Sequence, residues 1–166
     1  MLEKNRMNYL LIIFFSLISC NKEVPTQFSE AALNDTFITL NGDVVTFQSI
    51  LEKHQGKTIF IDVWANWCKD CIVGMPILKE LQSEYNDIDY VFLSLDKSLE
   101  SWKRGIEKYN LEGDHYYMQS GWNGDFGSFL DLDWIPRYMV IGTQGNIKLF
   151  KAIKVNDNQI KESLTN

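Results

Sequence analysis

Residues 58–85 limit the folds open to this chain more than any other segment, because a strand pattern there runs directly into a helical one. Residues 58–64 (Thr-Ile-Phe-Ile-Asp-Val-Trp) are rich in β-branched and aromatic types, which is typical of a buried strand. From Cys68 to Tyr85 the apolar residues recur at intervals of three and four, which predicts a helix. A strand that leads into a helix in this way indicates an α/β fold.

The rest of the chain continues this alternation of strands and helices. Residues 37–47 alternate between apolar and polar types on both sides of Asn41-Gly42, which predicts a β-hairpin at the N-terminal side of the fold. Further strands are predicted at residues 90–95, 116–118, 138–141 and 147–153, and helices at 47–54, 99–109, 126–130 and 157–164. This order predicts a mixed central sheet flanked by helices, with a parallel first crossover and an antiparallel last pairing.

The composition agrees with one globular domain and excludes several classes of protein. The 166 residues are 45% apolar and 13% aromatic, which is enough to fill a core. The formal net charge of −6 argues against a nucleic-acid partner, because proteins that bind nucleic acids carry a basic patch. Three cysteines are too few for a scaffold held by several disulfides.

The N-terminal twenty residues have the pattern of an export signal. Lys4 and Arg6 precede an uncharged apolar run over residues 7–19, which is too short to span a bilayer. Leu17-Ile18-Ser19-Cys20 resembles the lipobox of bacterial lipoproteins, in which the cysteine is acylated and becomes the first residue after cleavage. We therefore expect a signal peptide over residues 1–19, a lipidated Cys20 with a flexible tether to residue 34, and a folded domain over 35–166. A secreted protein with an incidental cysteine, or a short buried helix, is the alternative.

Cys68 and Cys71 are placed for dithiol chemistry. Two cysteines three residues apart at the start of a helix have Cα atoms about 5 Å apart, within the range of a disulfide. The free N–H groups and the dipole at a helix N-terminus favour a thiolate, which makes Cys68 the expected nucleophile and the exposed thiol. Cys71, one turn further, is the expected resolving thiol and the more buried one.

A Cys-x-x-Cys pair can also belong to a zinc site or form a structural disulfide. A zinc site needs four ligands, and the chain offers only His54 and His115 in addition, far apart and without paired spacing, so no metal is expected. A structural disulfide without turnover stays open.

Residues 64–71 (Trp-Ala-Asn-Trp-Cys-Lys-Asp-Cys) resemble the active-site segment of the thioredoxin superfamily. The resemblance extends over residues 37–166. Asp62 falls where thioredoxins keep a buried carboxylate, Pro76 on the kink of their active-site helix, and Ile135-Pro136 where they have a cis-proline that faces the disulfide. The opening hairpin resembles the TlpA-like and ResA-like envelope oxidoreductases, many of which are tethered to a membrane. The resemblance thus implies a thioredoxin-like fold with an N-terminal β-hairpin extension.

The resemblance also implies roles for single residues. Asp62, if buried, would have a raised pKa and take the proton of Cys71; otherwise it is a solvated residue at a strand end. A cis bond before Pro136 would turn the Ile135 backbone toward the disulfide, where it can pair with an extended substrate; the alternative is a trans proline in an edge strand. Trp67 would cover one side of the disulfide, or else be an ordinary core residue.

Three segments depart from the family pattern or fall outside it. Lys69-Asp70 stands between the cysteines in place of the Gly-Pro of thioredoxins. Arg137 follows Pro136, where it either adds positive charge near Cys68 or is a solvated surface arginine. The aromatic stretch over residues 116–126 either lines a substrate groove or is ordinary core and loop.

The function implied by the resemblance is that of a membrane-anchored thiol–disulfide oxidoreductase without a cofactor. It would face the periplasm, reduce disulfides of protein substrates and be reduced again by a membrane-associated electron donor. An oxidant or isomerase of the same fold, a copper-delivering module and a redox-inactive scaffold are the alternatives. Ala65 stands where thiol peroxidases need a threonine, and the tight cysteine spacing argues against copper delivery.

Overall fold

The computed structural model describes residues 23–165. The predicted signal peptide and the predicted lipidation of Cys20 lie outside these residues. Within residues 23–165, no helix has both the length and the apolar composition that a membrane crossing requires.

Within the described part of the chain, a seven-stranded mixed sheet forms the centre, in the order β2-β1-β5-β4-β3-β6-β7. β3 pairs in parallel with β4, and β4 with β5, whereas β3 and β6, and β6 and β7, are antiparallel. The strands are β1 (Thr36–Thr39), β2 (Val44–Thr46), β3 (Ile59–Trp64), β4 (Asp89–Ser94), β5 (Asp114–Tyr117), β6 (Arg137–Ile141) and β7 (Ile147–Ala152). The predicted parallel crossover and antiparallel last pairing are confirmed.

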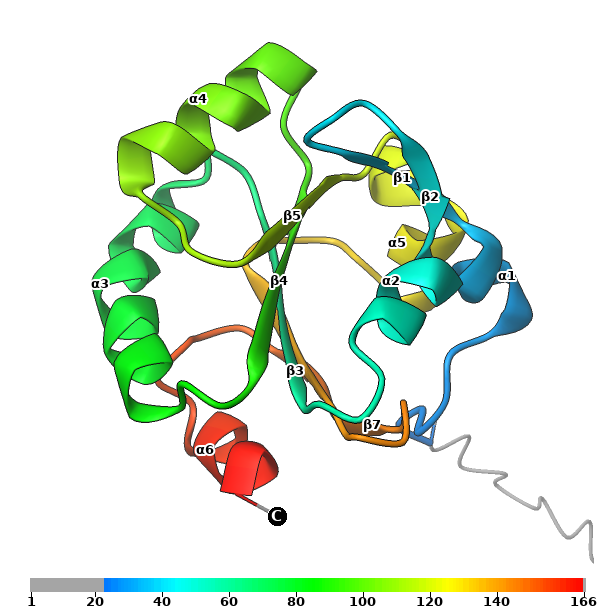
Figure 1. Cartoon of the computed structure of the whole chain (residues 1–166), viewed down its shortest axis with the longest axis vertical. Helices are drawn as coiled ribbons and strands as arrows, with labels where there is room; N and C mark the ends of the chain where they lie inside the picture. The colour runs from blue at the N-terminus through cyan, green and yellow to red at the C-terminus, as the bar shows by residue number, and fades with distance from the viewer. Residues whose placement is uncertain (1–22, 166) are drawn as a thin grey trace, which may run out of the picture.

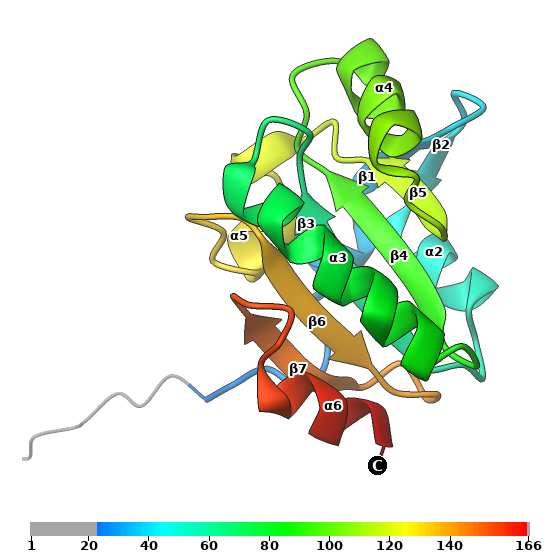
Figure 2. The same cartoon turned by 90° about the vertical axis from the view of Figure 1, so that its left-hand side faces the viewer.

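Helices cover both faces of this sheet. Figure 1 shows α3, α4 and α6 on one side and α1, α2 and α5 on the other, and Figure 2 shows α3 lying across β3 and β4. The helices are α1 (Glu30–Asn34), α2 (Phe47–Lys53), α3 (Lys69–Glu84), α4 (Leu99–Tyr109), α5 (Asp125–Phe129) and α6 (Asn158–Thr165), with a 3₁₀ turn η1 (Gly121–Asn123). Pro76 lies inside α3.

The N-terminal hairpin is part of the main sheet, because β1 pairs with β5 as well as with β2. Gly42 in its turn has φ +93°, a conformation that costs a residue without a Cβ little. The predicted hairpin and its place ahead of the core are therefore confirmed.

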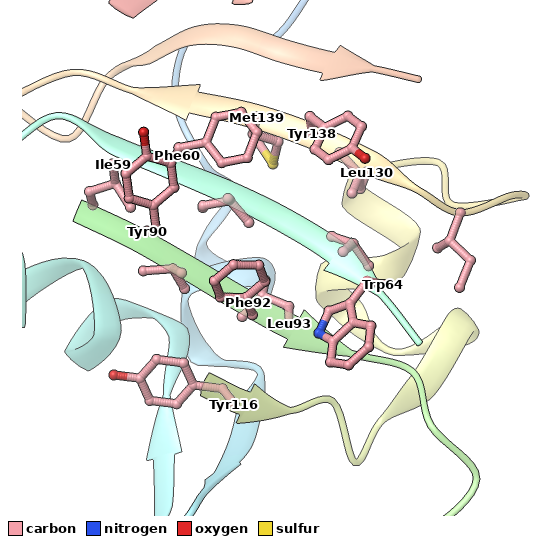
Figure 3. Close-up of a cluster of buried hydrophobic side chains, with 14 of the residues drawn as sticks. Ile59, Phe60, Trp64, Tyr90, Phe92, Leu93, Tyr116, Leu130, Tyr138 and Met139 are labelled. Atoms are coloured by element: carbon pink, nitrogen blue, oxygen red, sulfur yellow. The ribbon is translucent and has the colours of Figure 1, made fainter. Parts of the chain in front are cut away.

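The core lies on the central strands. Phe60, Trp64 and Phe92 are fully or almost fully buried, and Figure 3 shows them gathered with Tyr90 and Tyr138 on β3, β4 and β6. Phe60 contacts the rings of both tyrosines, at centroid distances of 5.6 and 5.5 Å. Because these strands are buried on both faces, their sequences are continuous apolar runs and not alternating ones.

The structure corrects the predicted flexible tether of residues 20–34 over its part from Thr26 to Asn34. The carbonyl oxygen of Thr26 accepts a hydrogen bond from the backbone of Ile147 (2.9 Å), and residues 30–34 form α1. The ring of Phe28 packs edge-on against Phe47, with centroids 4.8 Å apart. A helix of five residues is too short to show a period in the sequence, and its contacts are with distant residues. The fold therefore begins at about Thr26 and not at residue 35.

We expect Phe28→Ala to lower the free energy of unfolding by about 2 kcal/mol, because Phe28 is half-buried and contacts Phe47, Phe126 and Phe129. Urea denaturation followed by circular dichroism measures this loss. Val24→Ala is the matched control, since Val24 is 68% exposed and should leave stability unchanged. Equal stabilities for the two variants would mean that the N-terminal segment is not anchored as described.

Candidate active site

Cys68 and Cys71 form a disulfide at the N-terminus of α3, with Cα atoms 5.3 Å apart. Cys68 is the N-cap residue, and its Sγ accepts a hydrogen bond from the backbone N–H of Cys71 at 3.1 Å. The predicted exposure of Cys68 is wrong, because Cys68 is 5% exposed and Cys71 3%. Cys68 nevertheless lines a surface groove, so a reagent in the groove reaches Cys68 first.

The N-terminus of α3 favours negative charge on Cys68. The helix has 16 residues, and its first N–H groups and its dipole point toward the N-cap sulfur. A sulfur in this place is held as a thiolate more easily than one in water, which is the chemical requirement for attack on a disulfide.

The loop between β3 and α3 is held in place by the buried carboxylate of Asp96. The backbone N–H of Asn66 and the hydroxyls of Ser94 and Ser101 donate to this carboxylate, at 3.2, 2.9 and 3.1 Å. The Asn66 side-chain amide donates in turn to the carbonyl oxygen of Ser101 at 2.6 Å. The loop that leads into Cys68 is thereby fixed against α4. Sequence reasoning missed this network because Asn66 lies 30 and 35 residues from its partners Asp96 and Ser101.

The loop before β6 faces the disulfide. The Ile135–Pro136 peptide bond is cis, as the resemblance implied, and the carbonyl oxygen of Ile135 lies 3.6 Å from the Sγ of Cys68. Ile135 itself is buried. Pro136 directly precedes β6, which lies between β3 and β7, so the alternative of a trans proline in an edge strand is wrong.

Asp62 lies within β3 and is 4% exposed, so the alternative of a solvated residue at a strand end is wrong. Burial raises the pKa of its carboxyl to about 8. Its Oδ1 has no hydrogen-bond partner among residues 23–165. Its neighbour across the sheet is Tyr138, and a Cβ placed on Gly74 of α3 would lie 3.2 Å from the Tyr138 hydroxyl. That spacing puts this part of the sheet directly against the early turns of α3.

Arg137 is buried, which contradicts the alternative of a solvated surface arginine. Its guanidinium donates to the carbonyl oxygen of Pro136 (3.0 Å) and to the carboxylate of Asp133. A buried guanidinium requires such partners, because desolvation of an unpaired charge is costly. Arg137 thus ties the two ends of the loop that carries Ile135.

An open groove of about 560 Å³ lies beside Cys68. Trp67 lines it and is 46% exposed, so its alternative role as a core residue is wrong. Trp122, from the aromatic stretch over residues 116–126, lines it too, as does Trp134. Sequence reasoning missed Trp134, although a tryptophan outside any apolar period and directly before Ile135-Pro136 was a usable signal.

The two histidines lie outside the residues that line this groove. His54 is hydrogen-bonded through Nδ1 to Asp89 at 2.8 Å, near the start of β3 and β4. His115 stacks on Phe92, and burial lowers the pKa of its imidazole. A cavity of about 620 Å³ lies beside His54, at the end of the sheet away from the disulfide, and holds no thiol.

The sequence is similar to those of known oxidoreductases. A family model described as thioredoxin-like matches residues 56–147. The thioredoxin-like protein YneN of Bacillus subtilis is 30% identical over 137 residues, which are 76% of this chain and 78% of that protein. The thiol-disulfide oxidoreductase ResA of Bacillus thuringiensis is 25% identical over 123 residues, covering 67% of this chain and 69% of ResA.

The structure is similar to solved ones as well. A Bacteroides vulgatus protein assigned to the thiol-disulfide oxidoreductases shares 30% identity with a TM-score of 0.64, over 90% of each chain. A secreted disulfide oxidoreductase of Mycobacterium tuberculosis shares the fold, with 19% identity and a TM-score of 0.60 over 81% of this chain and 96% of that one. The Cys68–Cys71 disulfide lies at the N-terminus of a helix, in agreement with these similarities. The chain therefore belongs to the thioredoxin-like family and is a thiol–disulfide oxidoreductase of the TlpA and ResA type.

Proposed function

We propose that this chain is a lipid-anchored reductase that opens disulfides of protein substrates in the cell envelope. The observation that carries the proposal is the position of the Cys68 sulfur, which caps α3 and faces both the groove and the Ile135 carbonyl. The known activity of the family supplies the chemistry, and the N-terminal export pattern supports the location.

The reaction runs through a mixed disulfide. In the reduced enzyme the Cys68 thiolate attacks one sulfur of the substrate disulfide, and the other substrate sulfur leaves as a thiolate. Cys71 then loses its proton to Asp62 and attacks the Cys68 sulfur, so that the second substrate sulfur leaves. The substrate gains two electrons, and the enzyme ends with the Cys68–Cys71 disulfide. A membrane-associated thiol donor returns the two electrons by the same exchange in reverse.

Asp62 is suited to the second step because its carboxyl has a pKa close to that of a thiol. It lies on the sheet against which the first turns of α3 pack, and Cys71 is in the first of these turns. Since the Asp62 carboxyl has no hydrogen-bond partner on Oδ1 among the described residues, it has an acceptor available for a proton.

The anchor restricts where the domain can act. If Cys20 carries the lipid, six residue steps separate it from Thr26, where the fold begins, and a chain of that length spans at most about 20 Å. The domain would therefore stay close to the membrane surface, within reach of a membrane-associated electron donor.

Cys71→Ser tests exchange and anchoring in one experiment. Without the resolving thiol, the variant should accumulate substrate proteins joined to Cys68, visible as bands that disappear on reduction, and these should sediment with the membrane fraction. Adding Cys20→Ser should move the same adducts into the soluble fraction.

Cys68→Ser is the matched control and should trap at least tenfold less material, about the ratio expected when the nucleophile is lost. A Cys71→Ser chain without adducts would contradict the exchange, and unchanged sedimentation would contradict the anchor.

Asp62→Asn tests the buried carboxyl through stability. The carboxyl has a pKa of about 8 in the folded chain and near 3.9 when unfolded, so between these values only the folded state holds the proton. Wild-type stability should therefore fall as the pH rises from 4 to 8, by up to about 1.4 kcal/mol per pH unit relative to Asp62→Asn, and level off above 8. Urea denaturation of the oxidised protein at several pH values measures this.

The same variant should resolve a mixed disulfide about a hundredfold more slowly, measured as release of a thiol after Cys68 has been joined to it. Asp43→Asn, at an exposed position in the hairpin turn, is the control for both measurements. Parallel pH profiles for wild type and Asp62→Asn would show that the pKa of Asp62 is not raised in the folded chain, so that its carboxylate is too weak a base to take the proton of a thiol.

A further inference from the structure

Three of the five tryptophans of the chain line one groove, and that groove contains Cys68. They come from separate parts of the sequence: Trp67 from the loop before α3, Trp122 from η1, and Trp134 from the loop before β6. Trp67 is 46% exposed and Trp134 60%. Large apolar side chains that stay in water and gather at a reactive group are typical of a surface that a partner covers.

The wall that carries Trp122 is fixed by the N-terminal segment of the fold. The buried carboxylate of Asp35 accepts hydrogen bonds from the Ser120 hydroxyl and from the backbone N–H of Phe126, both at 2.9 Å. Gly127 of α5 packs so closely on η1 that a Cβ there would lie 2.3 Å from the carbonyl oxygen of Trp122. The position of Trp122 is therefore set by the packing on both sides of it.

The wall that carries Trp134 is fixed by Arg137. Its guanidinium holds the Asp133 carboxylate on one side of Trp134 and the Pro136 carbonyl oxygen on the other. Because Asp133 is ion-paired with Arg137, its charge is compensated where it meets the groove. Lys69 and Asp70 also line the groove, and their opposite charges leave it with little net charge. Two indole rings on backbone that is held in place therefore form a site for an apolar group and not for an ion.

We propose that this groove is a specificity subsite that holds a bulky apolar side chain next to the reactive cysteine of the protein substrate. This inference rests on the proposed function and adds the class of sequence that the enzyme prefers. Trp122 and Trp134 are its specificity-determining residues. The volume of about 560 Å³ accommodates a phenylalanine or leucine side chain together with neighbouring backbone.

The position of Cys68 explains why the selected side chain must flank the cysteine. Cys68 and Ile135 are both in the groove lining, so a substrate sulfur in contact with Cys68 brings its nearest neighbours in sequence to the indole rings. An apolar side chain beside the substrate cysteine removes the indole rings from contact with water, whereas a serine leaves them exposed to it. The preference should therefore appear in the rate of mixed-disulfide formation.

Two peptides that differ only beside the cysteine provide the test: Gly-Phe-Cys-Phe-Gly and Gly-Ser-Cys-Ser-Gly, each supplied as a symmetric disulfide-linked dimer. Reduced enzyme is mixed with each dimer, and chromatography after acid quenching gives the second-order rate constant for release of peptide thiol. We expect the phenylalanine dimer to react about tenfold faster with the wild-type chain, which is the usual discrimination by one apolar subsite. Each of the single variants Trp122→Ala and Trp134→Ala should bring the ratio of the phenylalanine rate constant to the serine rate constant close to 1.

The ratio of the two rate constants is the readout, because both peptides meet the same amount of folded protein in any one variant. Trp134→Phe should keep most of the preference, and Val44→Ala, an exposed apolar residue in the edge strand β2, should keep all of it. Equal rates with the wild type, or an unchanged ratio in both alanine variants, would overturn the subsite while leaving the proposed function intact. No reaction with either peptide would overturn the proposed function and this inference with it.

Discussion

The structure around the active site depends on one contact, in which the sulfur of Cys68 caps the N-terminus of α3. The backbone N–H of Cys71 points at that sulfur, so the helix that positions the second cysteine also stabilises charge on the first. This contact requires the chain to leave β3 at a fixed point and turn into α3 within four residues. The Asp96 network holds that turn, and the Ile135 loop closes over it from the other side. The Asp96 network and the Ile135 loop contribute to function because they hold their positions around the Cys68 sulfur at the N-terminus of α3.

A buried carboxyl without a full set of partners is a cost to stability that the rest of the core must offset. Asp62 stands in a strand whose other residues are apolar, and its burial raises the pKa to about 8. Because β3 is buried along its whole length, it keeps the Asp62 carboxyl away from water and still close to α3. The same burial that weakens the fold at neutral pH is what makes Asp62 fit to accept a proton from a thiol.

Local patterns in the sequence were sufficient for the sheet, the active-site helix and the redox pair. The β-rich run to Trp64, the helical spacing after Cys68 and the Asn41-Gly42 turn each depend on neighbours in sequence, and the structure confirms them. Contacts between distant residues could not be predicted in this way. The burial of Arg137 depends on Asp133 and the Pro136 carbonyl, and the ordering of Phe28 depends on rings about twenty to a hundred residues away. The exposure of Cys68 was predicted wrongly because the Ile135 carbonyl oxygen, which lies 3.6 Å from its sulfur, is brought there only in the folded chain.

The proposed function requires a dithiol that opens and closes reversibly and gives its electrons to other proteins. The most direct measurement is the reduction potential of the Cys68–Cys71 couple, obtained by equilibrating the full chain with thiol buffers of known potential. We expect a value near that of thioredoxin, about −270 mV, with full return of the disulfide after each cycle. A value near that of the oxidant DsbA, about −120 mV, would contradict a reductant, and a disulfide that does not form again would contradict redox turnover altogether.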